Sequence, residues 1–146
     1  MKESKNIFLN KTLLITGGTG SFGNAMLKGF LKSDLKEIRI FSRDEKKQED
    51  MRIEYRNDKL NFVIGDIRDF DSINNAMSGV DYVFHLAAES RIQPAIKNPS
   101  RAYNVNVIGT LNILELSRKY NIKRIMSMHH IFCKLFCFLP EIIQNV

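Results

Sequence analysis

The sequence predicts an α/β protein with a parallel sheet, and three observations support this fold class. Short apolar segments alternate with longer amphipathic segments along most of the chain, as expected of strands joined by helical crossovers. A glycine-rich turn follows the first apolar segment directly. The 146 residues also suffice for one domain with a substantial core. Right-handed crossovers then place helices on both faces of a doubly wound sheet.

The first half of the chain is expected to hold three strands and two helices. The strands are apolar segments bounded by polar turns, at residues 11–16, 37–42 and 60–64. One helix, at 21–32, carries apolar residues at helical spacing: Phe22, Ala25, Met26, Phe30 and Leu31. The other helix, at 44–56, is charged and exposed, with few apolar anchors: Met51, Ile53 and Tyr55.

The second half is expected to continue the alternation. Its helices are placed at 70–77 and 100–120, and its strands at 80–86 and 123–128. An Asp-rich turn begins the first of these helices, and Gly79 ends it. Pro94 and Pro99 predict a loop, after which Ser100 is expected to cap the long helix. We expect a doubly wound sheet with the strand order 3-2-1-4-5.

The turn after the first strand has the spacing of a dinucleotide-binding Rossmann fold. It reads Thr16-Gly17-Gly18-Thr19-Gly20-Ser21-Phe22-Gly23. Gly17 permits the tight turn, Gly20 lets the backbone approach the phosphates, and Gly23 lets the helix lie close to the strand. N–H groups at the start of the helix then meet the negative charge of the pyrophosphate. We therefore expect cofactor binding here rather than an ordinary loop.

Three further segments lie at the carboxyl ends of predicted strands, where α/β sheets bind ligands. Arg43 stands where an NAD site has its ribose-binding acid, which favours NADP over NAD, unless Arg43 only begins an exposed helix. Asp66 and Ile67 are placed to meet the adenine, or else they form an Asx turn at the strand end. The segment Leu86-Ala87-Ala88 suits a cofactor that passes close to the backbone, or else it is buried strand.

Taken in order, these motifs resemble those of extended short-chain dehydrogenase/reductases over residues 11–128. The segments that carry the resemblance are 16–23, Ile40-Phe41-Ser42-Arg43-Asp44-Glu45-Lys46-Lys47-Gln48 and Gly65-Asp66-Ile67-Arg68-Asp69. The most similar group is the UDP-N-acetylglucosamine 4,6-dehydratases of surface polysaccharide biosynthesis. The resemblance implies a bound NADP(H) that oxidises the sugar at C4, assists loss of water across C5–C6 and returns the hydride at C6.

The resemblance also implies a role for each matching residue. Four residues of the turn would contact the pyrophosphate: Thr19, Gly20, Ser21 and Phe22. Arg43 would hold the 2′-phosphate of NADP, and Asp66 and Ile67 would meet the adenine. Ala87 and Ala88 would lie along the nicotinamide side. The partner implied for the family is a nucleotide-sugar substrate, together with a homo-oligomer that we do not expect of this shorter chain.

Two segments differ from the dehydratase group. They are His85-Leu86-Ala87-Ala88-Glu89-Ser90 and Asn106-Val107-Ile108-Gly109-Thr110. Both look more like nucleotide-sugar epimerases and the hexose-type 4,6-dehydratases of the same superfamily. A nucleotide-sugar 4-epimerase is therefore the alternative function, with a nucleotide sugar as the substrate in either case.

The catalytic motif of the family is not found. Family members have Tyr-x-x-x-Lys after the fifth strand, with the tyrosinate as base, and this sequence has none there. His129 and His130 occupy the region of the family's Ser or Thr. We therefore expect no catalytic residue, a C-terminally truncated NADP(H)-binding domain at 1–128, and an atypical apolar tail at 129–146. A disrupted reading frame is the expected cause, and a non-catalytic dinucleotide-binding fragment is a further alternative.

Composition limits the kinds of partner and the cellular compartment that we expect for this protein. The net charge of +6 comes from basic residues interleaved with acidic ones, which indicates a solvated surface rather than a nucleic-acid partner. No apolar run approaches the ~20 residues of a membrane span, and two cysteines make no disulfide framework. We expect a cytoplasmic protein without a membrane partner. His129, Cys133 and Cys137 share a helical spacing but lack a fourth ligand, so no metal site is expected.

Overall fold

The computed structural model describes residues 6–127. Within them, a five-stranded parallel sheet has the order β3-β2-β1-β4-β5. Its strands are β1 (Thr12–Thr16), β2 (Glu37–Ser42), β3 (Leu60–Ile64), β4 (Tyr82–His85) and β5 (Arg124–Ser127). The predicted fold class and the strand order 3-2-1-4-5 are therefore confirmed.

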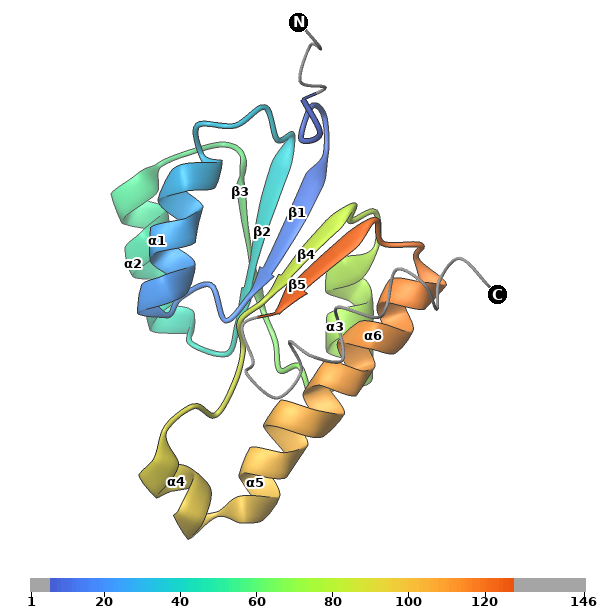
Figure 1. The fold of residues 1–146 in the computed structure, drawn as a ribbon. Coiled ribbons are helices and arrows are strands. Elements are labelled where there is room, and N and C mark those ends of the chain that lie inside the picture. The colour runs from blue at the N-terminus through green and yellow to red at the C-terminus, as the bar shows by residue number, and fades with distance from the viewer. Residues whose placement is uncertain (1–5, 128–146) are drawn as a thin grey trace, which may run out of the picture.

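Helices cover both faces of this sheet (Figure 1). They are α1 (Ser21–Phe30), α2 (Glu45–Tyr55), α3 (Phe70–Met77), α4 (Ile92–Lys97), α5 (Pro99–Tyr103), η1 (Asn104–Ile108) and α6 (Gly109–Lys119). Helices α1 and α2 lie against one face, and α3 and α6 against the other. Helix α4 and the start of α5 extend beyond the carboxyl edge of the sheet.

Each face of the sheet has its own apolar core, because helices cover both sides of the strands. The core beneath α1 and α2 is built from Leu13, Ile15, Leu27, Ile38, Ile40 and Met51. The core beneath α3 and α6 is built from Leu14, Phe41, Ile73, Met77, Val83, Ile113 and Leu116. Every residue of β1 is buried, since its side chains alternate between the two cores. The glycine-rich turn therefore leaves the sheet from its most firmly packed strand.

The segment after β4 is not the loop that the prolines predicted. Residues 92–97 form α4, and Pro94 lies in its first turn, where N–H groups have no partner within the helix. Asn98, rather than Ser100, caps the next helix, because its side chain accepts a hydrogen bond from the Arg101 N–H at 3.0 Å. Prolines near helix starts thus mark two helices here.

The long helix predicted after this segment is present, but its middle part has a different helical conformation. Elements α5, η1 and α6 follow one another without a break and form one rod in Figure 1. The middle element, η1, is a π-helical turn, a rare conformation that is frequent at functional sites. It holds the segment after β4 through Asn106, whose side chain makes two hydrogen bonds to the backbone of Glu89, at 2.9 and 3.1 Å.

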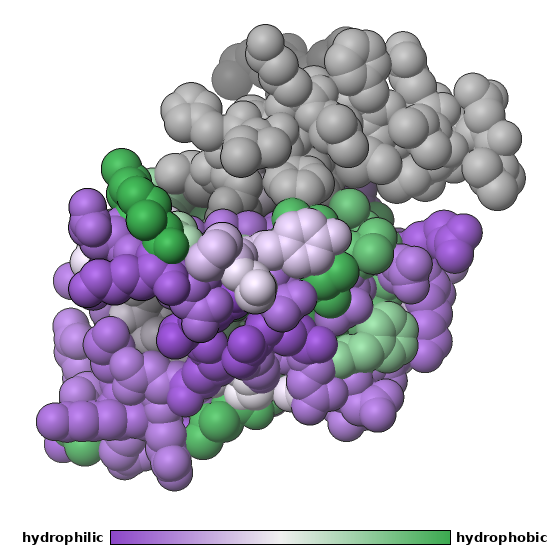
Figure 2. Space-filling model, turned by 90° about the horizontal axis from the view of Figure 1, so that it is seen from below, coloured by the Kyte–Doolittle hydropathy of each residue, from purple (hydrophilic) through white to green (hydrophobic). Residues whose placement is uncertain are grey.

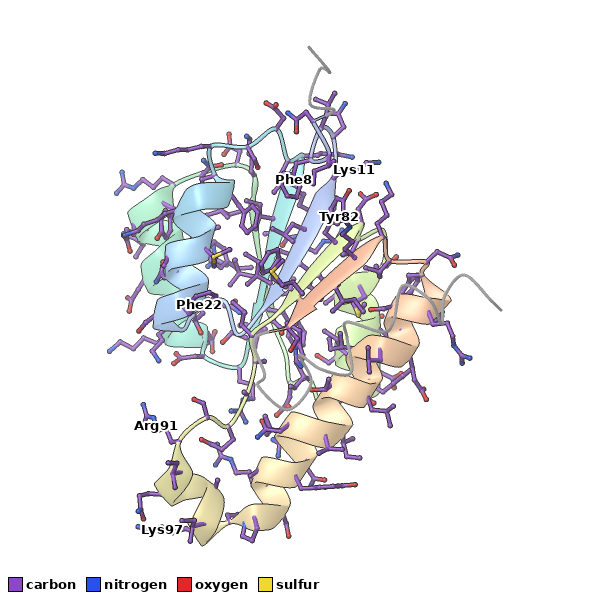
Figure 3. All side chains as sticks on the ribbon, viewed as in Figure 1. Phe8, Lys11, Phe22, Tyr82, Arg91 and Lys97 are labelled. Atoms are coloured by element: carbon purple, nitrogen blue, oxygen red, sulfur yellow. The ribbon has the colours of Figure 1, made fainter. Side chains whose placement is uncertain are left out.

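The amino edge of the sheet is closed by an aromatic contact and an ion-pair cluster. Phe8 packs edge-on against Tyr82 with the ring centroids 5.6 Å apart, and Figure 3 shows both at this edge. The Asp81 carboxylate accepts hydrogen bonds from the Thr12 N–H at 3.1 Å and from Lys123 Nζ at 2.9 Å. These contacts fasten the starts of β1, β4 and β5 to one another.

No helix within residues 6–127 is long and apolar enough to cross a membrane. The predicted apolar tail, 129–146, lies outside the described residues, as does residue 128 at the end of the fifth predicted strand.

Candidate functional site

Four loops meet at the carboxyl edge of the sheet, and together with the first turn of α1 they contain all of the predicted site residues. The glycine-rich turn follows β1, and the other loops follow β2, β3 and β4 (Figure 1). Figure 2 views the molecule from this edge, where the described residues are mostly hydrophilic with separate apolar groups. This edge is the ligand-binding side of open α/β sheets.

The three glycines of the turn differ in their surroundings. Gly17 has φ +69°, and a Cβ there would lie 2.7 Å from the backbone nitrogen of Ala87. A Cβ at Gly23 would lie 2.6 Å from the Cα of Gly18, so helix α1 packs directly on the turn. At Gly20 a Cβ would meet only the carbonyl oxygen of Gly17, at 3.3 Å. The outer two glycines are therefore required by packing, whereas the middle one borders open space apart from that one oxygen.

Helix α1 begins at this open space without a capping side chain. Its N-cap residue is Gly20, which makes no side-chain hydrogen bond, and its first turn holds no acidic residue. In contrast, Asp44 caps α2 and Asp69 caps α3 through their side chains. The first N–H groups of α1 thus remain available to an anion at the positive end of the helix dipole. Phe22 stands beside them, 45% exposed (Figure 3).

A pair of hydroxyl groups connects the glycine-rich turn to the loop after β2. Thr19 Oγ1 lies 2.8 Å from Ser42 Oγ, which also accepts a hydrogen bond from the Asp44 N–H at 3.2 Å. Between these residues, Arg43 is half-exposed, and its Nη1 lies 3.6 Å from Oδ2 of Asp66. The structure therefore brings Thr19, Arg43 and Asp66 to one edge, as the sequence predicted.

Asp66 already has charged partners in the loop after β3. The Arg68 guanidinium donates to both of its oxygens, from Nε at 3.0 Å to Oδ1 and from Nη2 at 2.6 Å to Oδ2. These hydrogen bonds lower the pKa of the Asp66 carboxyl, against burial, which raises it. The same pair raises the pKa of Arg68. An adenine amine would therefore share this carboxylate with Arg68, and the contact stays a prediction.

Ile67 belongs mainly to the core. Its side chain is only 5% exposed, and a Cβ at Gly109 would lie 2.5 Å from its Cδ1. Asn112 also donates to the Ile67 carbonyl oxygen at 2.9 Å. The loop after β3 is thus fixed on α6, and little of the Ile67 side chain remains for the predicted contact with an adenine ring.

The segment after β4 lies against the glycine-rich turn. The three residues Leu86, Ala87 and Ala88 are half-buried. The Leu86 N–H donates to the Thr16 carbonyl oxygen at 3.0 Å, which continues the pairing of β4 with β1. The Ala87 backbone approaches Gly17 so closely that a side chain on the glycine would not fit. The nicotinamide contacts predicted for Ala87 and Ala88 are compatible with this position and stay a prediction.

Sequence reasoning missed a buried polar group beside this segment. His85 is fully buried, with Nδ1 2.7 Å from Thr16 Oγ1 and Nε2 2.9 Å from Thr110 Oγ1. The signals available were a histidine that ends an apolar strand and a threonine that begins a helix, and both are common without such a contact. Only the packing of α6 over the sheet brings these side chains together.

Residues 6–127 contain no cluster of His, Cys, Asp and Glu side chains that could hold a metal ion. The histidine and cysteines weighed for such a site, His129, Cys133 and Cys137, lie outside the described residues.

A doubly wound sheet with a glycine-rich turn at the start of an uncapped helix defines the class of dinucleotide-binding α/β proteins. Residues 13–129 match the model of the family described as "Polysaccharide biosynthesis protein". The chain therefore belongs to this family.

Known relatives and solved structures agree with this placement. A UDP-glucose 4-epimerase of Rickettsia prowazekii is 55% identical over 126 residues, which are 84% of this chain and 37% of that protein. Pen from Bacillus thuringiensis has 36% identity and a TM-score of 0.80, over 83% of this chain and 37% of that one. A UDP-glucose 4-epimerase of Thermus thermophilus, solved in complex with NAD, has 26% identity and a TM-score of 0.68, over 78% and 36%. The chain thus spans little more than a third of the length of these proteins.

Proposed function

We propose that this chain binds a nicotinamide adenine dinucleotide across the carboxyl edge of its sheet. The observation that carries the proposal is the open space at Gly20, at the uncapped start of α1, between two glycines that packing requires. The pyrophosphate lies on Gly20 and accepts from the first N–H groups of the helix, next to Thr19, Ser21 and Phe22. A fold shared with a relative whose structure contains NAD supports the same cofactor class.

The two halves of the dinucleotide then lie on opposite sides of the turn. The adenosine half extends toward the loops after β2 and β3, which carry Arg43 and Asp66. The nicotinamide half extends toward the segment after β4, where Ala87 packs on Gly17. This direction follows from the strand order, because β2 and β4 flank β1 on opposite sides.

Arg43 supports NADP as the preferred form of the cofactor. Its guanidinium is half-exposed at the end of β2, where the ribose of an adenosine would lie, and a 2′-phosphate there gains charge-assisted hydrogen bonds. The relative from Thermus thermophilus was solved with NAD, so the preference belongs to this chain and requires its own measurement.

We further propose that the chain is the cofactor-binding part of a nucleotide-sugar 4-epimerase. The relatives named UDP-glucose 4-epimerase favour this function over the 4,6-dehydratase that the first motifs suggested. Residues 85–90 and 106–110 are compatible with it, since they look like nucleotide-sugar epimerases as well as hexose-type 4,6-dehydratases. Bound cofactor supplies hydride transfer at the sugar, while the residues described here bind and orient the dinucleotide.

Titration of the purified chain with NADPH and with NADH tests the proposed binding. The fluorescence of the reduced nicotinamide and a calorimetric titration both give a dissociation constant. We expect saturable binding of both cofactors with one site per chain, and tighter binding of NADPH. The absence of saturable binding by a chain that is folded by circular dichroism would contradict the proposal.

A further inference from the structure

His85 joins the sheet to the helix that covers it. It pairs in register with Thr16 at the end of the neighbouring strand, so the two side chains lie side by side on the same face. Its Nδ1 is 2.7 Å from Thr16 Oγ1, and its Nε2 is 2.9 Å from Thr110 Oγ1 at the start of α6. All three side chains are fully buried, so their hydrogen bonds form away from solvent.

The hydrogen-bond partners of His85 determine which of its ring nitrogens carries the proton. The Thr110 hydroxyl donates its single proton to the Asn106 carbonyl oxygen at 2.8 Å, so its oxygen accepts from His85 Nε2–H. In the neutral ring, Nδ1 then accepts from the Thr16 hydroxyl. The Thr16 oxygen in turn accepts from the Ala87 N–H at 3.4 Å. A neutral imidazole with its proton on Nε2 satisfies every one of these bonds.

Both ends of this network reach the segment after β4. On one side, Thr16 holds the N–H of Ala87, at the point where Ala87 packs on Gly17. On the other side, Asn106 holds the N–H and the carbonyl oxygen of Glu89 with its side chain. The backbone is therefore held at Ala87 and at Glu89, on either side of Ala88, by groups that His85 connects.

We propose that His85 is a positioning residue for the nicotinamide half of the cofactor. By linking Thr16 to Thr110, it holds residues 86–88 in place along the nicotinamide. This role rests on the proposed dinucleotide binding. The adenosine half is placed by loops after β2 and β3, on the other side of β1, so breaking the network affects the nicotinamide end selectively.

Three variants test this role on the 146-residue chain. Thr110→Val removes the hydroxyl that accepts from His85, and Thr110→Ser restores it. Ser117→Ala is the matched control, because Ser117 is a buried hydroxyl on the same helix that donates to the carbonyl four residues earlier, Ile113, at 2.6 Å. Each variant is titrated with NADH and with ADP-ribose, which lacks the nicotinamide. Neither ligand has a 2′-phosphate, so the proposed contact of Arg43 with that phosphate does not affect the comparison.

We expect Thr110→Val to bind NADH about threefold to tenfold more weakly, the size of one lost hydrogen bond, with a changed emission of the bound nicotinamide. Its affinity for ADP-ribose should stay unchanged, and Thr110→Ser and Ser117→Ala should match the parent chain with both ligands.

Two results would overturn the role of His85. In one, Thr110→Val binds NADH with unchanged affinity and emission. In the other, it loses affinity for NADH and ADP-ribose equally, which would indicate general structural damage. Thr16→Val breaks the opposite side of the network and carries the same expectation if Thr110→Val does not fold. Failure of the parent chain to bind NADH would instead contradict the proposed function, and the role of His85 with it.

Discussion

Arg43 projects from the end of β2 with half of its side chain exposed, next to the Asp66 carboxylate. Replacing it tests the cofactor preference. Arg43→Ala should bind NADPH about tenfold to hundredfold more weakly, because a guanidinium–phosphate pair contributes about 1.5–3 kcal/mol. Binding of NADH should change little. Titrations of both cofactors measure this, with Arg118→Ala as a control for the loss of an exposed arginine. Equal affinities of the parent chain for NADPH and NADH would refute the preference.

At the residue scale, the structural roles of the glycines were easier to predict from the sequence than the contacts of the buried polar side chains. Gly17 and Gly23 act through backbone geometry within one turn, and their spacing alone reveals it. His85 and Thr110 are 25 residues apart, and only the packing of α6 on the sheet brings them together. The same holds for Ile67, which the pattern placed at the adenine and which packs mainly in the core.

At the scale of the element, the glycines of α1 give opposite predictions for the same substitution. Gly23→Ala should destabilise the fold by about 1–3 kcal/mol, because its Cβ would lie 2.6 Å from rigid backbone at Gly18. Gly29→Ala should stabilise it by up to about 1 kcal/mol, since no atom lies within 4 Å and alanine favours the helix. Urea unfolding measures both. A similar effect of the two substitutions would contradict the close packing of the turn on α1.

The amino edge of the sheet should make stability depend on pH through Asp81. Burial raises the pKa of its carboxyl, but the hydrogen bonds from Lys123 and from the Thr12 N–H together outweigh burial. The pKa therefore lies below the ordinary 3.8. The stabilisation is therefore complete above about pH 3.8 and is lost as the pH falls through the folded-state value.

Asp81→Asn should accordingly cost about 1–2 kcal/mol at pH 7 and progressively less below pH 3.8. Urea unfolding of the variant and of the parent chain across this range measures the difference. Asp58→Asn, at an exposed position, serves as the control. A destabilisation that is constant with pH would show that the charge of Asp81 plays no part.

Element types were predictable where the spacing of apolar residues repeats, and prolines misled the prediction elsewhere. The five strands and the helices over 21–30 and 70–77 follow that spacing, whereas the helix over 45–55 was predictable from its charged, exposed composition. Pro94 predicts a loop, but it occupies the first turn of α4, which tolerates proline. The π-helical turn η1 has no sequence signal of its own, because its residues have ordinary helical spacing.

At the scale of the whole molecule, the alternation of strands and helices predicted a doubly wound parallel sheet, because crossovers limit the possible topologies. The order 3-2-1-4-5, expected of a dinucleotide-binding sheet, was confirmed. The order also determines which loops meet, and so it determines the site. The finer chemistry did not follow, because one fold carries different reactions and the strand order does not choose among them.

The 146-residue chain should bind cofactor without turning over a nucleotide sugar. Its sequence has no Tyr-x-x-x-Lys after the fifth strand, and general-base assistance contributes about 10²–10⁴-fold to such reactions. Incubation with NAD⁺ or NADP⁺ and either UDP-glucose or UDP-N-acetylglucosamine, followed by chromatography of the sugars, checks this. Epimer or 4-keto product above the protein-free control would contradict the expectation. Loss of that product in a variant with His129→Ala and His130→Ala would assign the base to the histidines.

The most direct test of the account is a cofactor titration of Gly20→Val beside Gly29→Val. A Cβ at Gly29 would meet no atom within 4 Å, and one at Gly20 would meet only the Gly17 carbonyl oxygen, at 3.3 Å. Gly20 also has extended backbone angles that valine adopts readily, so both variants should fold. Only Gly20 lies where the pyrophosphate is proposed to approach. We predict that Gly20→Val loses NADPH and NADH binding at least a hundredfold, whereas Gly29→Val binds both like the parent chain. Undiminished binding by a folded Gly20→Val would contradict the assignment of this turn to the cofactor.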